Sequence, residues 1–174
     1  MKVQRRPNGG FDLAQAPSHL IRRCQQYYGD LYAMEAGARE LTPQQFTVLA
    51  ALEHNEGASQ TTLVDITGID RSTLAEMARR MVDKGLLERE RTEEDQRANA
   101  VAITATGRKA LRSARLAAER AERALLDALP ASDRVKFVKL LGQIASAADS
   151  YAMNGGAKAM RKAALRRRRE RLRR

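Results

Sequence analysis

The chain of 174 residues contains few aromatic residues, one cysteine and no long apolar run. Because Cys24 is the only cysteine, an intramolecular disulfide framework is excluded. No apolar run approaches the roughly 20 residues that span a bilayer. Residues 1–17 also lack the apolar centre of a secretory signal. These absences predict a cytoplasmic protein without a membrane anchor.

Motifs for metal binding and catalysis are also missing. His19 and His54 are the only histidines, and their separation matches no metal-ligand spacing. The sequence has no phosphate-binding glycine loop, no nucleophile elbow and no paired His/Asp motif. We therefore expect no metal, no cofactor and no enzymatic activity.

Positive charge is abundant, but most of it lies at the C-terminus. Ten Lys and Arg residues and one Glu give residues 158–174 a net charge of +9, out of +11 for the whole chain. The preceding residues therefore carry only +2. Any nucleic-acid binding by the body must depend on where its charges are placed, not on bulk basicity.

Apolar spacing and capping residues predict a mainly helical chain with one small β-hairpin. Thr42, Ser59, Asp70 and Thr104 are expected N-caps, and Gln45 completes a capping box with Thr42. Short alternating segments, 86–91 and 100–104, predict the hairpin. The expected helices are 18–40, 43–54, 59–67, 71–84, 104–129 and 133–153, after a mobile leader at 1–17.

The segment 59–104 orders these parts as a winged helix-turn-helix, a module that binds duplex DNA. On the helix from Arg71, an apolar stripe formed by Leu74, Met77, Ala78, Met81 and Val82 faces inward. The outward face then carries Arg71, Ser72, Thr73, Glu76 and Arg80, side chains that can contact phosphates or base edges. The hairpin adds Arg89, Arg91 and Arg97, with Asp95 placed to hold Arg97 for a minor groove. Taken alone, each feature also fits an ordinary solvated surface.

Because the helices and the hairpin follow one another in this order, residues from about 20 to 144 resemble the MarR family of bacterial transcription regulators. The matching segments are LTPQQFTVLAAL, LVDITGIDRSTLAEMARRMVDKGLLERE and DQRANAVAITATG. The resemblance implies a homodimer built by helices 18–40 and 105–153, with a winged helix-turn-helix at 41–104. It also implies a pseudo-palindromic DNA operator and, usually, repression that a small molecule relieves. The basic tail at 154–174 extends beyond the part that resembles the family.

The resemblance carries the recognition role to Arg71, Ser72, Thr73, Glu76 and Arg80, and the wing role to Asp95 and Arg97. It departs from the family at Glu76, where many members have Arg, Thr or Ser. An acidic side chain there would repel phosphates, so Glu76 either accepts from a cytosine amine or faces water.

The resemblance further implies an effector pocket between the dimerisation helices and the DNA-binding lobe. The candidates on the first helix are His19, Arg22, Arg23, Gln26 and Tyr27, together with Asp30. An arginine and an aromatic ring suit an aromatic carboxylate or a related thioester. The alternative is that the tyrosines belong to a dimer core and the arginines are solvated.

Two other functions stay open. Cys24 follows two arginines, which would suit an oxidant sensor, but it lies on the apolar stripe of its helix and has no resolving cysteine in the chain. That position predicts an inert core cysteine. Alternatively, the basic tail could make the protein a non-specific, nucleoid-type DNA-binding protein.

Deletion of residues 158–174 tests the tail as an electrostatic clamp on flanking phosphates. Binding should weaken about equally on all duplexes, and the log–log salt slope should flatten by about 0.9 for each phosphate that the tail neutralises. Fluorescence anisotropy across a salt series measures both effects. An unchanged slope after deletion would rule out the clamp.

Overall fold

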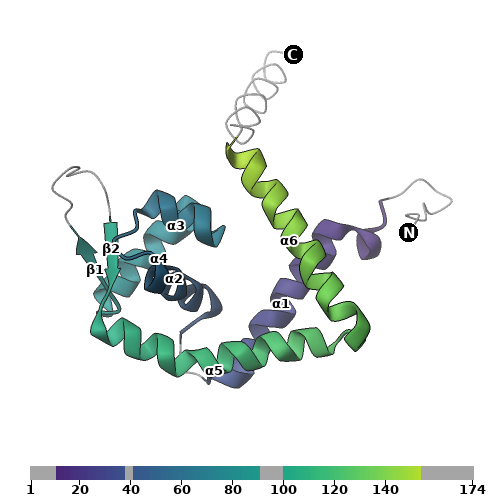
Figure 1. Ribbon diagram of the computed structural model, residues 1–174, viewed down its shortest axis with the longest axis horizontal. Helices are drawn as coiled ribbons and strands as arrows, with labels where there is room; N and C mark the ends of the chain where they lie inside the picture. The colour runs from purple at the N-terminus through teal and green to yellow at the C-terminus, as the bar shows by residue number, and fades with distance from the viewer. Residues whose placement is uncertain (1–10, 38–40, 91–99, 154–174) are drawn as a thin grey trace, which may run out of the picture. The chain divides into compact units, whose positions relative to one another are not determined.

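The computed structural model describes residues 11–37, 41–90 and 100–153. These residues form a mainly helical fold with a two-stranded hairpin, as the sequence predicts (Figure 1). The elements are the 3-10 turn η1 (Leu13–Gln15), α1 (Pro17–Ala36), α2 (Pro43–His54), α3 (Gln60–Thr67), α4 (Arg71–Asp83), β1 (Leu87–Glu90), β2 (Ala100–Ile103), α5 (Ala105–Asp127) and α6 (Ala131–Met153). The chain divides into two compact units, 1–128 and 129–174.

The predicted caps begin four helices of the first unit. Each cap side chain accepts a hydrogen bond from a backbone N–H three residues later, which satisfies a donor that the helix itself leaves unpaired. Gln45 also closes the predicted capping box by accepting from the Thr42 N–H at 3.0 Å. The cap–donor pairs are Thr42–Gln45 at 3.3 Å, Ser59–Thr62 at 3.1 Å, Asp70–Thr73 at 3.0 Å and Thr104–Gly107 at 2.9 Å.

A single apolar core joins α2, α3, α4, the hairpin and the first half of α5. We call this part, residues 41–114, the lobe. The predicted apolar stripe of α4 lies in this core, with Val82 half-buried at its edge. Burial of one face leaves the opposite face of α4 to solvent. The largest fully buried side chains of the lobe are Val48, Leu49, Leu52, Leu63, Leu74, Met81, Leu87, Ile103 and Leu111.

The hairpin is antiparallel, with Leu87 opposite Ile103 and Glu90 opposite Ala100. Leu87 and Ile103 are both 2% exposed, which fixes the register because a slip of one strand by one residue would turn one of these side chains to solvent. The connecting segment 91–99, with Arg91, Asp95 and Arg97, lies outside the described residues.

α1 packs against the second half of α5. Tyr32 is 1% exposed and lies with Ala118 and Ala121 in a second apolar cluster. Its ring centroid is 6.4 Å from that of Tyr28 and 6.3 Å from that of Phe46 on α2. Tyr32 therefore connects α1 to the lobe as well as to α5.

The structure corrects several predictions for α1. The helix begins at Pro17 instead of residue 18, and it ends at Ala36 instead of residue 40. Part of the predicted leader folds, because Asp12 caps η1. Cys24 is exposed, so its predicted place in the core is wrong within the single chain: side chains 20–27 are all exposed there, and Tyr28 is the next that is half-buried.

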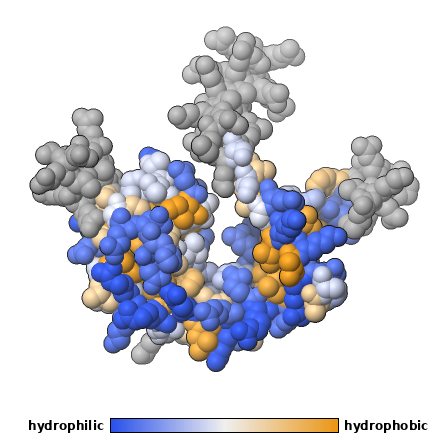
Figure 2. All heavy atoms as spheres, viewed as in Figure 1, coloured by the Kyte–Doolittle hydropathy of each residue, from blue (hydrophilic) through white to orange (hydrophobic). Residues whose placement is uncertain are grey.

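The second unit consists, in its described part, of α6. Apolar side chains on this helix lie at the surface, as Figure 2 shows. Val135, Val138, Leu141 and Ile144 recur at intervals of three residues and are 81%, 53%, 41% and 58% exposed. Each of them lies one turn from the next, so they form an uncovered apolar stripe that winds around the helix. None of the helices in the described ranges is long and apolar enough to cross a membrane.

Gly107→Ala tests the junction between the hairpin and α5. A Cβ at Gly107 would overlap the Leu86 carbonyl oxygen and lie 2.9 Å from Cγ1 of Ile103. The backbone would have to shift, so we expect a loss of about 1–3 kcal/mol in the free energy of unfolding. Gly142→Ala on α6 is the matched control, because a Cβ there meets nothing within 4 Å. Urea unfolding that gives equal midpoints for the two variants would contradict the close packing.

Candidate nucleic-acid interface

The exposed face of α4 carries all five recognition-helix candidates. Arg71, Ser72, Thr73, Glu76 and Arg80 are each exposed, while Leu74 and Met77 on the opposite side lie in the core. The buried side fixes the rotation of α4 about its axis and therefore fixes which side chains can reach a ligand. The structure thus brings the predicted set together on one surface.

The N-terminus of α4 is held by hydrogen bonds from two directions. Asp70 accepts from the Thr73 N–H at 3.0 Å and from the Ser72 hydroxyl at 2.6 Å. Arg71 donates to the Thr61 hydroxyl of α3 at 2.6 Å. α3 and α4 are therefore connected where both helices begin, as a helix-turn-helix requires.

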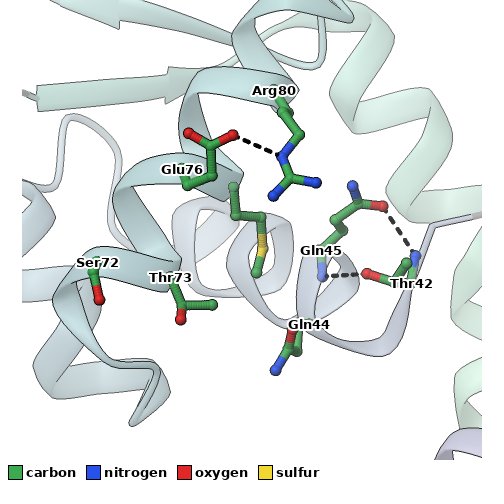
Figure 3. Close-up of a pocket in the computed structure, with 8 residues that line it drawn as sticks. Thr42, Gln44, Gln45, Ser72, Thr73, Glu76 and Arg80 are labelled. Atoms are coloured by element: carbon green, nitrogen blue, oxygen red, sulfur yellow. Dashed lines mark hydrogen bonds and ion pairs between the residues drawn. The ribbon is translucent and has the colours of Figure 1, made fainter.

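A hollow of about 480 Å³ lies beside this face, between the start of α2 and α4 (Figure 3). Because its polar lining comes from two helices, it offers hydroxyl, amide and guanidinium groups to one ligand surface. The lining residues are Thr42, Gln44, Gln45, Ser72, Thr73, Glu76, Met77 and Arg80.

Charges on α4 are paired along the helix. Glu76 accepts from Arg79 through Nη2 at 2.9 Å and Nε at 3.3 Å, and it forms an ion pair with Nε of Arg80 at 3.2 Å. Asp83 accepts from Nη1 of Arg79 at 3.1 Å. The Arg79 hydrogen bond and charge, with a smaller effect of Arg80, hold the pKa of Glu76 below its ordinary value. Glu76 is therefore an ionised partner of two arginines.

Arg89, the first of the hairpin candidates, is exposed on β1. Its strand follows α4 directly, because the Gly85 N–H donates to the Val82 carbonyl at 2.8 Å and the Leu86 N–H donates to the Met81 carbonyl at 2.9 Å. These hydrogen bonds attach the hairpin directly to the last turn of the recognition helix.

The predicted effector residues occupy the exposed first half of α1. His19 and Arg23 line a hollow of about 410 Å³ with Phe11, Asp12 and Leu13. Gln26 donates to Asp30 at 3.2 Å, and Arg22 and Tyr27 are exposed. The structure therefore does not bring these residues into one cluster.

A different set of α1 residues faces the lobe. Gln25, Tyr28 and Gly29 line a hollow of about 520 Å³ with residues from α2, the α3–α4 turn and α4. The sequence-based candidates are the adjacent Gln26 and Tyr27. The spacing of the tyrosines could have identified this side of α1. Tyr28 lies four residues before the buried Tyr32 and therefore on the same side of the helix.

Burial, followed by the charge of Glu122 and a hydrogen bond with it, raises the pKa of Tyr28 above its ordinary value. The phenol is therefore protonated at neutral pH. Within the described ranges, no group of three or more His, Cys, Asp or Glu side chains could hold a metal ion.

The fold and this surface define a winged helix-turn-helix DNA-binding protein. A model of the MarR family matches residues 40–98. The transcriptional regulator HosA of Escherichia coli O157:H7 is 33% identical over 102 residues, which cover 59% of this chain and 76% of HosA. The chain belongs to the MarR family and is a MarR-type transcription regulator, not an enzyme.

Solved structures agree with this assignment. The PcaV regulator of Streptomyces coelicolor, in complex with its natural ligand, is 34% identical with a TM-score of 0.71, over 80% of this chain and 98% of PcaV. BpsR of Bordetella bronchiseptica, whose DNA binding is regulated by 6-hydroxynicotinic acid, is 27% identical with a TM-score of 0.72, over 78% and 97%. The repressor CouR, bound to a 23-mer DNA duplex, is 30% identical with a TM-score of 0.66, over 76% and 94%. CouR is also solved with p-coumaroyl-CoA.

The pH dependence of folding tests the cap of α4. Hydrogen bonds from Ser72 and then Thr73 hold the pKa of Asp70 well below its usual 3.8. A carboxyl with a lowered folded pKa stabilises the fold above its unfolded pKa, and this contribution is lost as pH falls through the folded pKa. Asp70→Asn keeps a capping oxygen but removes the charge, so its urea midpoint should be lower than that of the wild type at neutral pH.

The difference between the two midpoints should shrink as pH falls from about 5 toward about 2, because Asp70 becomes protonated over that range in the unfolded wild type while it stays ionised in the folded protein. Chemical unfolding at several pH values measures it. A difference that stays constant across the range would show that Asp70 acts only through its shape.

Proposed function

We infer that this protein is a sequence-specific DNA-binding repressor, released from its operator by a small aromatic ligand. The observation that carries DNA binding is the exposed face of α4, where polar and cationic side chains stand opposite a buried apolar stripe. Such a helix can enter the major groove with Arg71 and Arg80 toward bases or phosphates. Arg89, Arg91, Asp95 and Arg97 would contact the adjacent groove and backbone from the wing.

A homodimer supplies two such helices. The apolar stripe of α6 exposes Val135, Val138, Leu141 and Ile144 to solvent in the isolated chain. α1 adds exposed Leu20, Ile21 and Tyr27. Burial of these side chains against a second copy would remove a large apolar area from water. The repeated half-sites of a pseudo-palindromic operator would then match the two-fold symmetry of the protein.

The hollow between α1 and the lobe is the proposed effector site. Tyr28, Pro43 and Ile69 offer apolar surfaces to a flat ring, and Gln25, Gln44 and Thr47 offer hydrogen-bonding groups. A planar ring with hydroxyl or amide substituents fits this chemistry. The lining contains Asp70 and no cation, so a carboxylate or thioester would extend out of the hollow.

Arg22 is the cation best placed for that charged end. It lies three residues before Gln25 and seven before Gly29, both of which line the hollow. These intervals put the three residues on one side of α1, with Arg22 one turn beyond the mouth. A guanidinium there could pair with a carboxylate or with the phosphates of a coenzyme A group.

Thr42, Gln44 and Thr73 line both this hollow and the one beside the recognition face. A ligand in the effector hollow would therefore contact the first turn of α4 directly. If it fits the DNA-free position of α4 better than the DNA-bound one, it lowers DNA affinity by population shift.

The test uses the duplex that the protein itself selects from a random-sequence pool. Anisotropy should show tighter binding to this duplex than to a scrambled one, and one compound from a panel of hydroxylated aromatic acids and their coenzyme A thioesters should weaken it. Arg80→Ala should lose at least about tenfold in affinity if Arg80 contacts a base, while Arg120→Ala on α5 should lose little. Equal binding of both duplexes would contradict sequence-specific recognition.

Adjacent glutamines on α1 give a matched pair for the effector site. Gln25→Ala removes a lining residue, so it should raise the compound concentration needed for release while leaving DNA affinity unchanged. Gln26→Ala removes a side chain that donates to Asp30 and does not line the hollow, so it should behave as the wild type. Equal responses of the two variants would contradict this location of the site.

A further inference from the structure

Glu76 is an acidic residue at the centre of a surface proposed to face DNA. It is exposed and lies one turn from Ser72 and one turn from Arg80, so it cannot avoid the neighbourhood of the phosphates. An unpaired carboxylate there would oppose binding. The contacts of Glu76 show why the residue is compatible with a DNA-binding face.

Arginines contact both oxygens of the Glu76 carboxylate. It receives two hydrogen bonds from Arg79, one to each oxygen, and the Oε1 atom is also paired with Nε of Arg80 at 3.2 Å. An acceptor engaged by two guanidinium groups has little capacity left for a cytosine amine. This occupancy favours a role within the protein over direct contact with a base.

The two arginines differ in how many of their guanidinium nitrogens contact a carboxylate. Arg79 also donates to Asp83 through Nη1, so all three of its nitrogens contact carboxylates. Arg80 is paired only through Nε among the described residues, and its two terminal nitrogens make no hydrogen bond to another described side chain. Figure 3 shows these terminal nitrogens directed away from Glu76 and into the hollow beside Gln45.

This arrangement orients the two terminal nitrogens of the Arg80 guanidinium. The terminal nitrogens of a guanidinium match the O6 and N7 acceptors of guanine, or two oxygens of a phosphate, in bidentate geometry. Pairing of Nε with a fixed carboxylate restricts the side chain before DNA arrives, which lowers the ordering cost of that contact. At the same time, Glu76 and Asp83 cancel two positive charges and so reduce binding that does not depend on sequence.

We propose that Glu76 is a specificity-determining positioning residue, which holds Arg79 away from DNA and orients the terminal nitrogens of Arg80 toward a guanine edge. The proposal rests on the proposed function, because it assumes that α4 enters the major groove. It differs from both sequence-based alternatives, in which Glu76 itself accepts from cytosine or is simply solvated.

Glu76→Gln tests the proposal on the selected duplex, a scrambled duplex and a set with each base pair of the selected site replaced in turn. Loss of the charge should release both arginines for phosphates, so affinity for the scrambled duplex should rise. The salt slope should steepen by up to about 0.9 for each additional phosphate that is neutralised. Preference for the selected duplex should fall about tenfold, since a bidentate arginine–guanine pair discriminates by about 5- to 150-fold.

Asp83→Asn is the matched control. It removes the other carboxylate that contacts Arg79 but leaves the Glu76–Arg80 pair in place. It removes the same charge from the same helix, so it should keep the preference for the selected duplex. The two variants should unfold at similar urea concentrations, because exposed ion pairs contribute little to stability.

A double-mutant cycle with Arg80→Ala identifies the route of the effect. If Glu76 acts through Arg80, Glu76→Gln should cause no further loss of preference in the Arg80→Ala background. If Glu76 contacts cytosine itself, the two losses should add, and Glu76→Gln should change the preferred base at one position from cytosine to adenine. That result would overturn the proposal.

Two other outcomes are also decisive. If Glu76→Gln strengthens binding to all duplexes by the same factor, Glu76 acts only as a charge and the proposal is wrong, while the proposed function stands. If the wild type does not distinguish the selected from the scrambled duplex, the proposed function itself fails, and the inference fails with it.

Discussion

The close contact of α5 with the end of the α4–β1 connection organises the DNA-binding unit. The Leu86 carbonyl accepts from the Thr104 N–H at 3.2 Å and from its hydroxyl at 3.1 Å, and Thr104 then caps α5 through the Gly107 N–H. Only glycine at 107 allows α5 to come this near. One junction thus joins the last turn of the recognition helix, both strands of the hairpin and the long helix that packs on α1.

Much of this could be predicted from local sequence because local physics determines it. Side-chain caps at Thr42, Ser59, Asp70 and Thr104 begin helices without help from the rest of the fold. The buried stripe of α4 follows from the period of 3.6 residues, since Leu74, Met77, Ala78 and Met81 leave no other side to face inward. The recognition face is the complement of that stripe, so it was predictable to the same extent.

The first helix was harder to predict because its environment comes from distant parts of the chain. Its apolar residues are spread around the helix, and only contact with α5 selects Tyr28 and Tyr32 as the inward side. Adjacent helical residues lie about 100° apart, so choosing Gln26 and Tyr27 instead of Gln25 and Tyr28 rotates the site away from the lobe. Cys24 illustrates the same limit, since α5 does not cover that turn.

The pairing of charges on α4 gives the recognition face a property that composition alone would miss. Of the four charged side chains between residues 76 and 83, two are acidic, so the segment is neutral overall. Long-range attraction to DNA must therefore come from cations outside this segment, such as Arg71, Lys84 and those of the hairpin and α5. A helix with neutral charge but one oriented guanidinium gains little from phosphates in general and much from a correctly placed guanine. On this argument, discrimination by α4 comes from geometry more than from charge.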